Sequence, residues 1–485
     1  MENFIFTKLK SGAIWIGIAQ VVGQFIRLGS NLILAWLLTP DAFGLAALAM
    51  TLFTGLVLMS DLGTGASLIR SKHADSPPFY NTVFTIQFGQ GALLFLVCLL
   101  LASPMAGFYD EPALQDMIMF GGFGLFLQGS RSTSWPLLQR DMRIKRLTVY
   151  GMITQLTGVS ATIAYAFFYP EPLALIIGFV VSAFVATLIS HLLHRHEIRN
   201  RLSWDASSFH EIFHFGKWIF ISSILNFLSQ RSDRFILGKL SSVETLGVYH
   251  VAMMLADLPR FAVHLISERL LYPTFAHYAK EDVVLLNKKI LQIRSVLLPA
   301  MWVSSLIVIV LADPFFFYLY KDSYHDAMWI APCLVLMLWY SILINAMDRI
   351  PVALGDSKLL AKMWTLILPV KVVCAYAGYL YFGLAGFIAG LTLGSFAGYL
   401  RLTLAARKIG LNFLKQDCKY TITLLLVTAL YFYLKVWMRI PLGEINIWLS
   451  TMAFLVISLC GGGIVVFRIK KLIGQVDMGK NDLIL

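Results

Sequence analysis

Charged residues are scarce in this chain. Only 14% of its 485 residues are charged and 58% are hydrophobic, whereas soluble domains usually carry about a quarter charged residues. This composition excludes an ordinary water-soluble protein. Long polar connections are scarce as well, so no soluble catalytic domain fits between the apolar segments. The five cysteines are widely separated and form no CxxC pair, so we expect neither a disulfide framework nor a metal or cofactor.

Long apolar runs make up most of the chain instead. A helix needs about 20 predominantly apolar residues to cross a bilayer, and fourteen runs of suitable length are each bounded by charge, proline or glycine. The predicted fold class is an all-α polytopic membrane protein with fourteen transmembrane helices. The expected spans are 12–38, 43–68, 82–102, 114–138, 147–168, 173–193, 215–237, 246–272, 296–319, 328–350, 363–382, 384–405, 420–436 and 447–467.

The basic residues are distributed unevenly between the connections on the two sides. Of the 39 lysines and arginines, 25 lie in one alternate set of connections and only 4 in the other. Because positively charged loops stay in the cytoplasm, both termini are expected to be cytoplasmic. The net charge of +12 is therefore mainly a topology signal. Dispersed basic residues of this kind argue against nucleic-acid binding.

The first span is repeated half-way along the chain. Equivalent positions are Gly12 and Gly216, Arg27 and Arg231, and Gly44 and Gly247. Six spans, an even number, separate the copies, so the two halves are expected to run parallel with a cavity between them. The predicted organisation is an N-terminal lobe over 1–200, a C-terminal lobe over 201–406 and a terminal pair of helices over 407–485.

Polar residues form a stripe along the first span, and the seventh span repeats the feature. Gln20, Gln24, Arg27 and Asn31 follow one another at spacings of four, three and four residues, which is one face of a helix. The seventh span carries Arg231 and Arg234. Charges are costly in hydrocarbon and usually face a cavity or a partner, so these residues are candidate cavity residues.

The eighth span carries four ionisable residues on one helical face: Asp257, Arg260, His264 and Glu268. In one interpretation they form a self-neutralising salt-bridge ladder that only holds helices together. In the other they line a cavity, where Arg260 meets an anion and Asp257 or His264 exchanges a proton. Both interpretations remain open at the level of sequence.

The remaining deep charges add to an excess of cations. Lys371 lies well inside the eleventh span, while Asp61 is nearer the cytoplasmic end of the second span and is a further candidate for ion coupling. Because deep cations outnumber deep anions, anionic cargo is favoured. Arginine binds phosphate through two parallel hydrogen bonds, so a diphosphate group is a natural candidate.

Two short motifs have alternative interpretations. His210, Glu211 and His214 match the HExxH pattern of zinc proteases, but a polar helix at the membrane surface is the favoured interpretation. Glycines recur every fourth residue at 386, 390, 394 and 398. This ladder predicts close helix packing, with a flexing element as the alternative.

Two stretches of the sequence resemble a known family. The segments LLTPDAFGLAALAMTLFTGLVLMSDLGTGASLIR (37–70) and SDRFILGKLSSVETLGVYHVA (232–252) are similar to the polysaccharide-transporter branch of the MOP exporters, the Wzx-type oligosaccharide flippases. The resemblance implies two six-helix bundles around a cationic cavity that opens alternately to each side. By position, it assigns Arg27, Asp61, Arg231, Arg234, Asp257 and Arg260 to that cavity.

The function predicted from these features is transport without covalent chemistry. We expect a flippase that moves undecaprenyl-diphosphate-linked oligosaccharide repeat units across the inner membrane for cell-surface polysaccharide synthesis, driven by ion exchange. The expected partners are this lipid-linked oligosaccharide, membrane lipid and a polysaccharide polymerase complex. The alternatives are a cation-coupled drug or metabolite antiporter, a lipid II flippase, and a membrane polymerase or glycosyltransferase of the same pathway.

Overall fold

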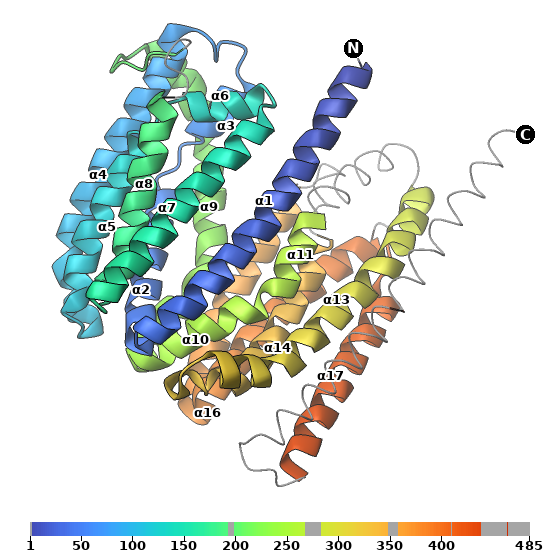
Figure 1. Ribbon diagram of the computed structural model, residues 1–485. Coiled ribbons are helices and arrows are strands. Elements are labelled where there is room, and N and C mark those ends of the chain that lie inside the picture. Colours follow the sequence, from blue (N-terminus) through green and yellow to red (C-terminus); the bar gives the residue numbers. More distant parts are fainter. Residues whose placement is uncertain are drawn as a thin grey trace, which may run out of the picture. The chain divides into compact units, whose positions relative to one another are not determined.

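The described part of the chain is helical throughout. The computed structural model describes residues 2–192, 198–266, 283–347, 357–408, 410–437 and 463, and these ranges contain no β-strand (Figure 1). The helices are α1 (Glu2–Leu37), α2 (Pro40–Leu58), α3 (Thr64–Arg70), α4 (Pro77–Tyr109), α5 (Ala113–Gly129), α6 (Ser134–Arg140), α7 (Ile144–Phe168), α8 (Leu173–Leu192), α9 (Ala206–Leu240), α10 (Val243–Ala256), α11 (Leu258–Ile266), α13 (Val283–Leu319), α14 (Ala327–Asn345), α16 (Ser357–Lys408) and α17 (Leu414–Trp437), with a short 3-10 helix η2 (Asp322–Tyr324).

The all-helical class and the membrane-spanning character agree with the sequence. Within the described residues, seven helical stretches are long and apolar enough to cross a membrane: Gly17–Leu37, Pro40–Leu58, Pro77–Tyr109, Leu173–Leu192, Ile290–Leu319, Asp322–Asn345 and Trp364–Lys408. Apart from residue 463, the last expected span, 447–467, lies outside the described residues. The count of fourteen spans therefore stays a prediction.

Three of the expected spans are broken into two helices. The second span divides into α2 and α3, where Gly63 has a positive φ of 67° before the first residue of α3. The fourth divides into α5 and α6, and the eighth into α10 and α11 at Asp257, two residues before Pro259. Proline cannot donate the backbone hydrogen bond that a continuous helix needs, so its position explains the last break.

Helix α16 is a hairpin of two antiparallel limbs. Gly383 has a φ of 60° and a ψ of −145°, a conformation that permits the chain to reverse between the eleventh and twelfth expected spans. The glycine ladder of the second limb packs against the first: its four members meet Gly378, Cys374, Lys371 and Ile367 in turn, so closely that a Cβ would clash. The close-packing interpretation of the glycine ladder is thus confirmed.

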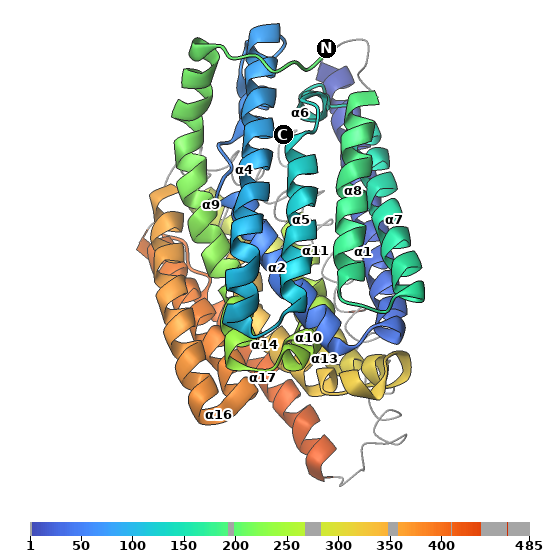
Figure 2. The same cartoon turned by 90° about the vertical axis from the view of Figure 1, so that its left-hand side faces the viewer.

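The chain forms two compact units, residues 1–250 and 251–485. In the first unit α4 packs on α5, α5 on α8, α8 on α7 and α7 on α1, while α9 lies along α2, α3 and α4 (Figures 1 and 2). In the second unit α14 contacts α11, α13 and α16, and α17 packs on α13 and α14.

Two glycines at equivalent positions of the repeat contact each other's helices. A Cβ on Gly44 of α2 would collide with the carbonyl oxygen of Val243, and a Cβ on Gly247 of α10 would collide with the carbonyl oxygen of Pro40. Each glycine therefore meets the backbone four residues before the other glycine. Glycine is needed at both positions because the two backbones approach so closely.

Candidate functional site

The polar face of α1 is held together by contacts within the helix. Arg27 is exposed; its guanidinium donates to the side-chain oxygen of Gln24, while Asn31 Nδ2 donates to the Arg27 carbonyl oxygen at 2.7 Å. Helix α7 fixes the rotation of α1, because Gln155 Nε2 donates to the carbonyl oxygen of Gly23 at 2.9 Å. The structure thus groups three predicted cavity residues, Gln24, Arg27 and Asn31, on one helix.

The α9–α10 hairpin carries further polar residues close to Arg231 and Arg234, and two of them, Tyr249 and His250, were not singled out by the sequence prediction. Tyr249 of α10 donates its hydroxyl to Asp233 Oδ2 of α9 at 2.8 Å. Arg234 Nε and His250 Nδ1 are buried and have no hydrogen-bond partner among the described residues. Tyr249 and His250 lie two and three residues after the repeat glycine Gly247, and this position was the only sequence signal that pointed to them.

Asp257 and Arg260 form a bidentate ion pair. Arg260 Nε lies 2.5 Å from Asp257 Oδ1, and Arg260 Nη2 lies 3.0 Å from Asp257 Oδ2. The two side chains are 35% and 27% exposed, respectively, so the pair remains accessible. Asp257 occupies the break between α10 and α11, and Arg260 is in the first turn of α11. Both interpretations of this face allow such a contact; the side chains of His264 and Glu268 lie outside the described residues.

Lys371 and Asp61 each contact residues of their own hairpin or loop. The aliphatic part of Lys371 packs on Gly394 in the α16 hairpin. Asp61 Oδ1 accepts a hydrogen bond of 2.8 Å from the backbone N–H of Gly63, which stabilises the break between α2 and α3. The contacts that the structure shows for the predicted site residues are therefore within one helix or hairpin. Their convergence on one cargo stays a prediction.

A buried ion pair in the second unit had no counterpart in the sequence prediction. In the structure Arg294 of α13 is 1% exposed and pairs with Asp417 of α17, which is equally buried. Tyr399 of α16 donates its hydroxyl to Asp417 Oδ2 at 2.8 Å. Arg294 therefore has a structural role, and nothing in its sequence neighbourhood identifies a partner 123 residues away.

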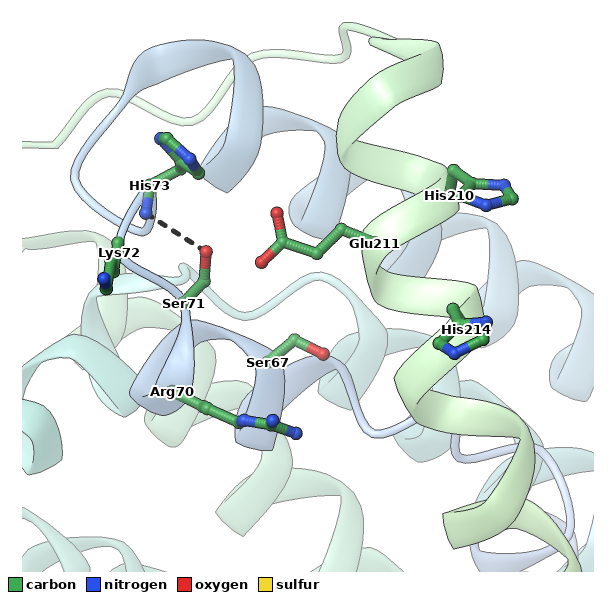
Figure 3. Close-up of a pocket in the computed structure, with 8 residues that line it drawn as sticks. All are labelled: Ser67, Arg70, Ser71, Lys72, His73, His210, Glu211 and His214. Carbon is green, nitrogen blue, oxygen red and sulfur yellow. Dashed lines mark hydrogen bonds between the residues drawn. The ribbon is translucent and has the colours of Figure 1, made fainter.

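A cavity of about 610 Å³ lies in the first unit, between the end of α3 and the start of α9. Its walls come from α3, from the segment that follows it and from the first turns of α9 (Figure 3). The lining residues are Ser67, Arg70, Ser71, Lys72, His73, His210, Glu211 and His214. The distribution of basic residues predicts that this end of the unit is cytoplasmic.

The HExxH residues line this cavity. Glu211 points from α9 toward Ser71, whereas His210 points away from Glu211 (Figure 3). The ring centroids of His210 and His214 are 6.4 Å apart. Within the described residues no group of three histidine, cysteine or acidic side chains is arranged to hold a metal ion. The geometry favours the interpretation of a polar surface helix.

Comparison with known proteins identifies a family whose profile matches this chain. The profile of a family described as polysaccharide biosynthesis protein matches residues 33–329. The lipopolysaccharide biosynthesis protein WzxC of Escherichia coli is 24% identical over 56% of this chain and 54% of its own. The teichuronic acid biosynthesis protein TuaB of Bacillus subtilis is 23% identical over 58% of each. The chain thus spans little more than half the length of these relatives.

Solved structures share the fold. The lipid II flippase MurJ in an inward closed conformation superimposes with a TM-score of 0.70 at 12% identity, covering 97% of this chain and 100% of its own. An inward-facing multidrug transporter of the MATE family in the MOP superfamily has a TM-score of 0.63 at 14% identity, over 82% of this chain and 98% of its own. At such identities the similarity is one of fold.

Proposed function

The chain belongs to the family of polysaccharide biosynthesis proteins, and from this premise we propose that it is a flippase for lipid-linked oligosaccharides. The cargo is an oligosaccharide repeat unit on undecaprenyl diphosphate, which crosses a bacterial inner membrane on its way to a cell-surface polysaccharide. The observation that carries this proposal is the combination of the family match with a flippase-like fold over nearly the whole chain. The protein acts as a transporter, and no bond is made or broken.

The cargo's diphosphate is proposed to bind the intramembrane cations. Arg27, Arg231, Arg234, Arg260 and Lys371 are the candidates, and Gln24 and Asn31 extend the polar surface around Arg27. Guanidinium groups match the geometry of phosphate oxygens and remain charged at every physiological pH. The sugars would move through the wetted part of the cavity while the polyprenyl tail stays in lipid.

The Asp257–Arg260 pair suggests how an ion could be coupled to this movement. A guanidinium that is bound bidentately by a carboxylate has fewer donors left for a phosphate. Protonation of Asp257 removes the competing negative charge, so Arg260 becomes available to the cargo; deprotonation restores the pair and releases the cargo. His264 and Asp61 are further candidates for carrying the coupling ion. In an alternating-access cycle the protein has to reach both the state in which Asp257 and Arg260 form their ion pair and the state in which they are separated.

The topology that belongs to this proposal has fourteen spans in two parallel six-helix lobes, over 1–200 and 201–406, and a terminal pair over 407–485. Both termini are cytoplasmic. A polysaccharide polymerase complex would then receive the repeat units on the outer face.

Deletion of the gene tests the proposal. Undecaprenyl-diphosphate-linked repeat units should accumulate on the cytoplasmic face, and surface polymer should disappear. Unchanged lipid-linked intermediates would contradict it. Since the fold is shared with a multidrug transporter, efflux of a lipophilic cation is measured in parallel; efflux without any change in polymer would assign the antiporter function instead.

A further inference from the structure

We propose that the cavity between α3 and α9 is a binding site for a phosphorylated sugar, separate from the intramembrane cations. Here this cavity is called the α3–α9 pocket, and it is lined by the eight residues shown in Figure 3. Its volume of about 610 Å³ falls within the range of small-molecule sites. The inference rests on the proposed function, because the head of a lipid-linked oligosaccharide is such a phosphorylated sugar.

A buried apolar cluster joins the two helices that line the α3–α9 pocket. Leu68 of α3 and Ile212 of α9 are both fully buried, and each is flanked by residues that line the pocket. The same cluster contains Phe79, Val83 and Leu137. Burying Leu68 and Ile212 together fixes the rotation of both helices. The preceding residues, Ser67 and Glu211, are thereby held in the lining of the pocket.

The connection that leads into α9 is hydrogen-bonded to α4. The backbone N–H of Arg201 donates to Asn81 Oδ1 at 2.9 Å, and the backbone N–H of Asp205 donates to Thr82 Oγ1 at 3.0 Å. Asp205 caps the N-terminus of α9, because its side chain accepts a hydrogen bond of 2.8 Å from the backbone N–H of Ser208. These contacts position the wall of the pocket before any ligand arrives, which lowers the entropic cost of binding.

The charges of the pocket suit an anion that also carries hydroxyl groups. Arg70 and Lys72 contribute two positive charges, and Arg70 points from α3 toward α9 (Figure 3). Ser67 and Ser71 add hydroxyl groups. The lining has a single carboxylate, Glu211, which points inward and accepts hydrogen bonds only. A phosphate would contact the cations, and the hydroxyl groups of an attached sugar would donate to Glu211.

Binding to purified protein tests the assignment. Full-length protein in nanodiscs of zwitterionic lipid is titrated with inorganic diphosphate and with glucose 1-phosphate, and binding is followed by ³¹P NMR. The double substitution Arg70→Ala with Lys72→Ala should weaken the binding of both probes by about tenfold or more, since charge-assisted contacts are lost. Glu211→Gln should weaken glucose 1-phosphate and leave inorganic diphosphate unchanged or tighter.

Matched variants separate a site from general surface charge. Arg143→Ala with Arg146→Ala removes two exposed basic residues outside the pocket from the same unit and should leave both affinities unchanged. His73→Glu adds a negative charge at an exposed pocket position and should weaken diphosphate binding even if the alanine pair folds poorly. Equal affinities in wild type and both pocket variants, or equal losses in the control pair, would overturn the proposal. Stoichiometric zinc binding that His210→Gln abolishes would overturn it in favour of a metal site.

Membrane lipid and cargo share the phosphate chemistry, so a last comparison identifies the source. Glucose 1-phosphate binding that persists in phosphatidylglycerol nanodiscs supports the cargo head as ligand, whereas displacement supports a phospholipid headgroup at the same phosphate site. The result is independent of transport. If gene deletion leaves lipid-linked intermediates unchanged while the pocket still binds glucose 1-phosphate, the flippase proposal fails and the binding site stands. If transport is shown and the pocket variants bind as wild type, the flippase proposal stands and the binding site is refuted.

Discussion

Arg294 on α13 and Asp417 on α17 form an ion pair in which each side chain is 1% exposed. The Arg294 guanidinium also lies over the Phe413 ring, 4.9 Å from its centroid, and Tyr399 donates to the second carboxylate oxygen. Further along α17, Thr421 accepts from Trp339 Nε1 at 2.8 Å and Tyr431 donates to Asp313 at 2.5 Å. Helix α17 is therefore fixed to α13, α14 and α16 by polar contacts along its length.

Removal of one partner of this pair should be strongly destabilising. Asp417→Ala leaves the buried Arg294 charge uncompensated, and we expect a loss of about 3–5 kcal/mol in unfolding free energy. Replacement of both residues, Arg294→Met with Asp417→Leu, should cost much less because no unpaired charge remains. Thermal unfolding of the purified protein in detergent checks both variants. A double variant as unstable as the single one would show that the pair itself supplies the stability.

The reciprocal glycine contact between α2 and α10 should tolerate no added atoms. Gly44→Ala and Gly247→Ala each bring a Cβ against the backbone of the opposite helix, and overpacking of this kind costs about 1–3 kcal/mol. Gly151→Ala in α7 meets open space and serves as the control. It should be neutral or slightly stabilising because alanine favours helix. Polymer export and melting temperature are measured together; wild-type values for both interface variants would contradict the close contact.

Arg27 and Arg260 should be needed for transport and dispensable for insertion. Arg27→Ala and Arg260→Ala are expected to lose surface polysaccharide while reaching the membrane at normal levels. Arg27→Lys should recover only part of the function, because an ammonium group cannot bind phosphate bidentately. Surface polymer is quantified against membrane-inserted protein, with Arg143→Ala as the control. Wild-type polymer in both alanine variants would remove these residues from the cavity assignment.

The folding stability should depend on pH through Asp205, and it should fall as the pH is lowered. Hydrogen bonds from the hydroxyls of Ser207 and Ser208 and from the Ser208 backbone N–H lower the pKa of Asp205 to about 2, from about 3.9 in an unfolded chain. The ionised form is favoured in the folded state, so its stabilisation is fully present above about pH 4 and is lost as pH falls toward about 2. Asp205→Ala should lower the melting temperature at pH 7, and the difference from wild type should shrink in this acid window.

Asp326→Ala is the matched control for that measurement. Asp326 also precedes a helix, α14, but its side chain makes no capping hydrogen bond. Its substitution should leave the melting temperature and its pH dependence close to wild type. If the two substitutions behave alike, the cap at α9 is not the source of the effect.

Local features of the sequence anticipated much of the helical framework. Hydropathy predicted an all-helical membrane protein, and the glycine at 383 between two apolar runs marks the reversal of the α16 hairpin. The spacing of four residues in the glycine ladder predicted close packing, which the contact between Gly390 and Cys374 illustrates. The break at Gly63 was missed, because an apolar run long enough to span looks the same whether or not the helix inside it is interrupted, whereas Pro259 beside Asp257 indicated a bend there.

The partners of the charged residues could not be predicted in the same way. The helical spacing of Asp257 and Arg260 revealed their contact because both lie within one turn of backbone. Arg294 and Asp417, in contrast, lie 123 residues apart, and residues of α3 and α9 meet at one pocket although more than 130 positions separate Arg70 from His210. Hydropathy and periodicity act over one helix and thus determine which segments enter the membrane and which face is polar. Which polar faces meet depends on the packing of helices against one another, and only the tertiary structure decided it.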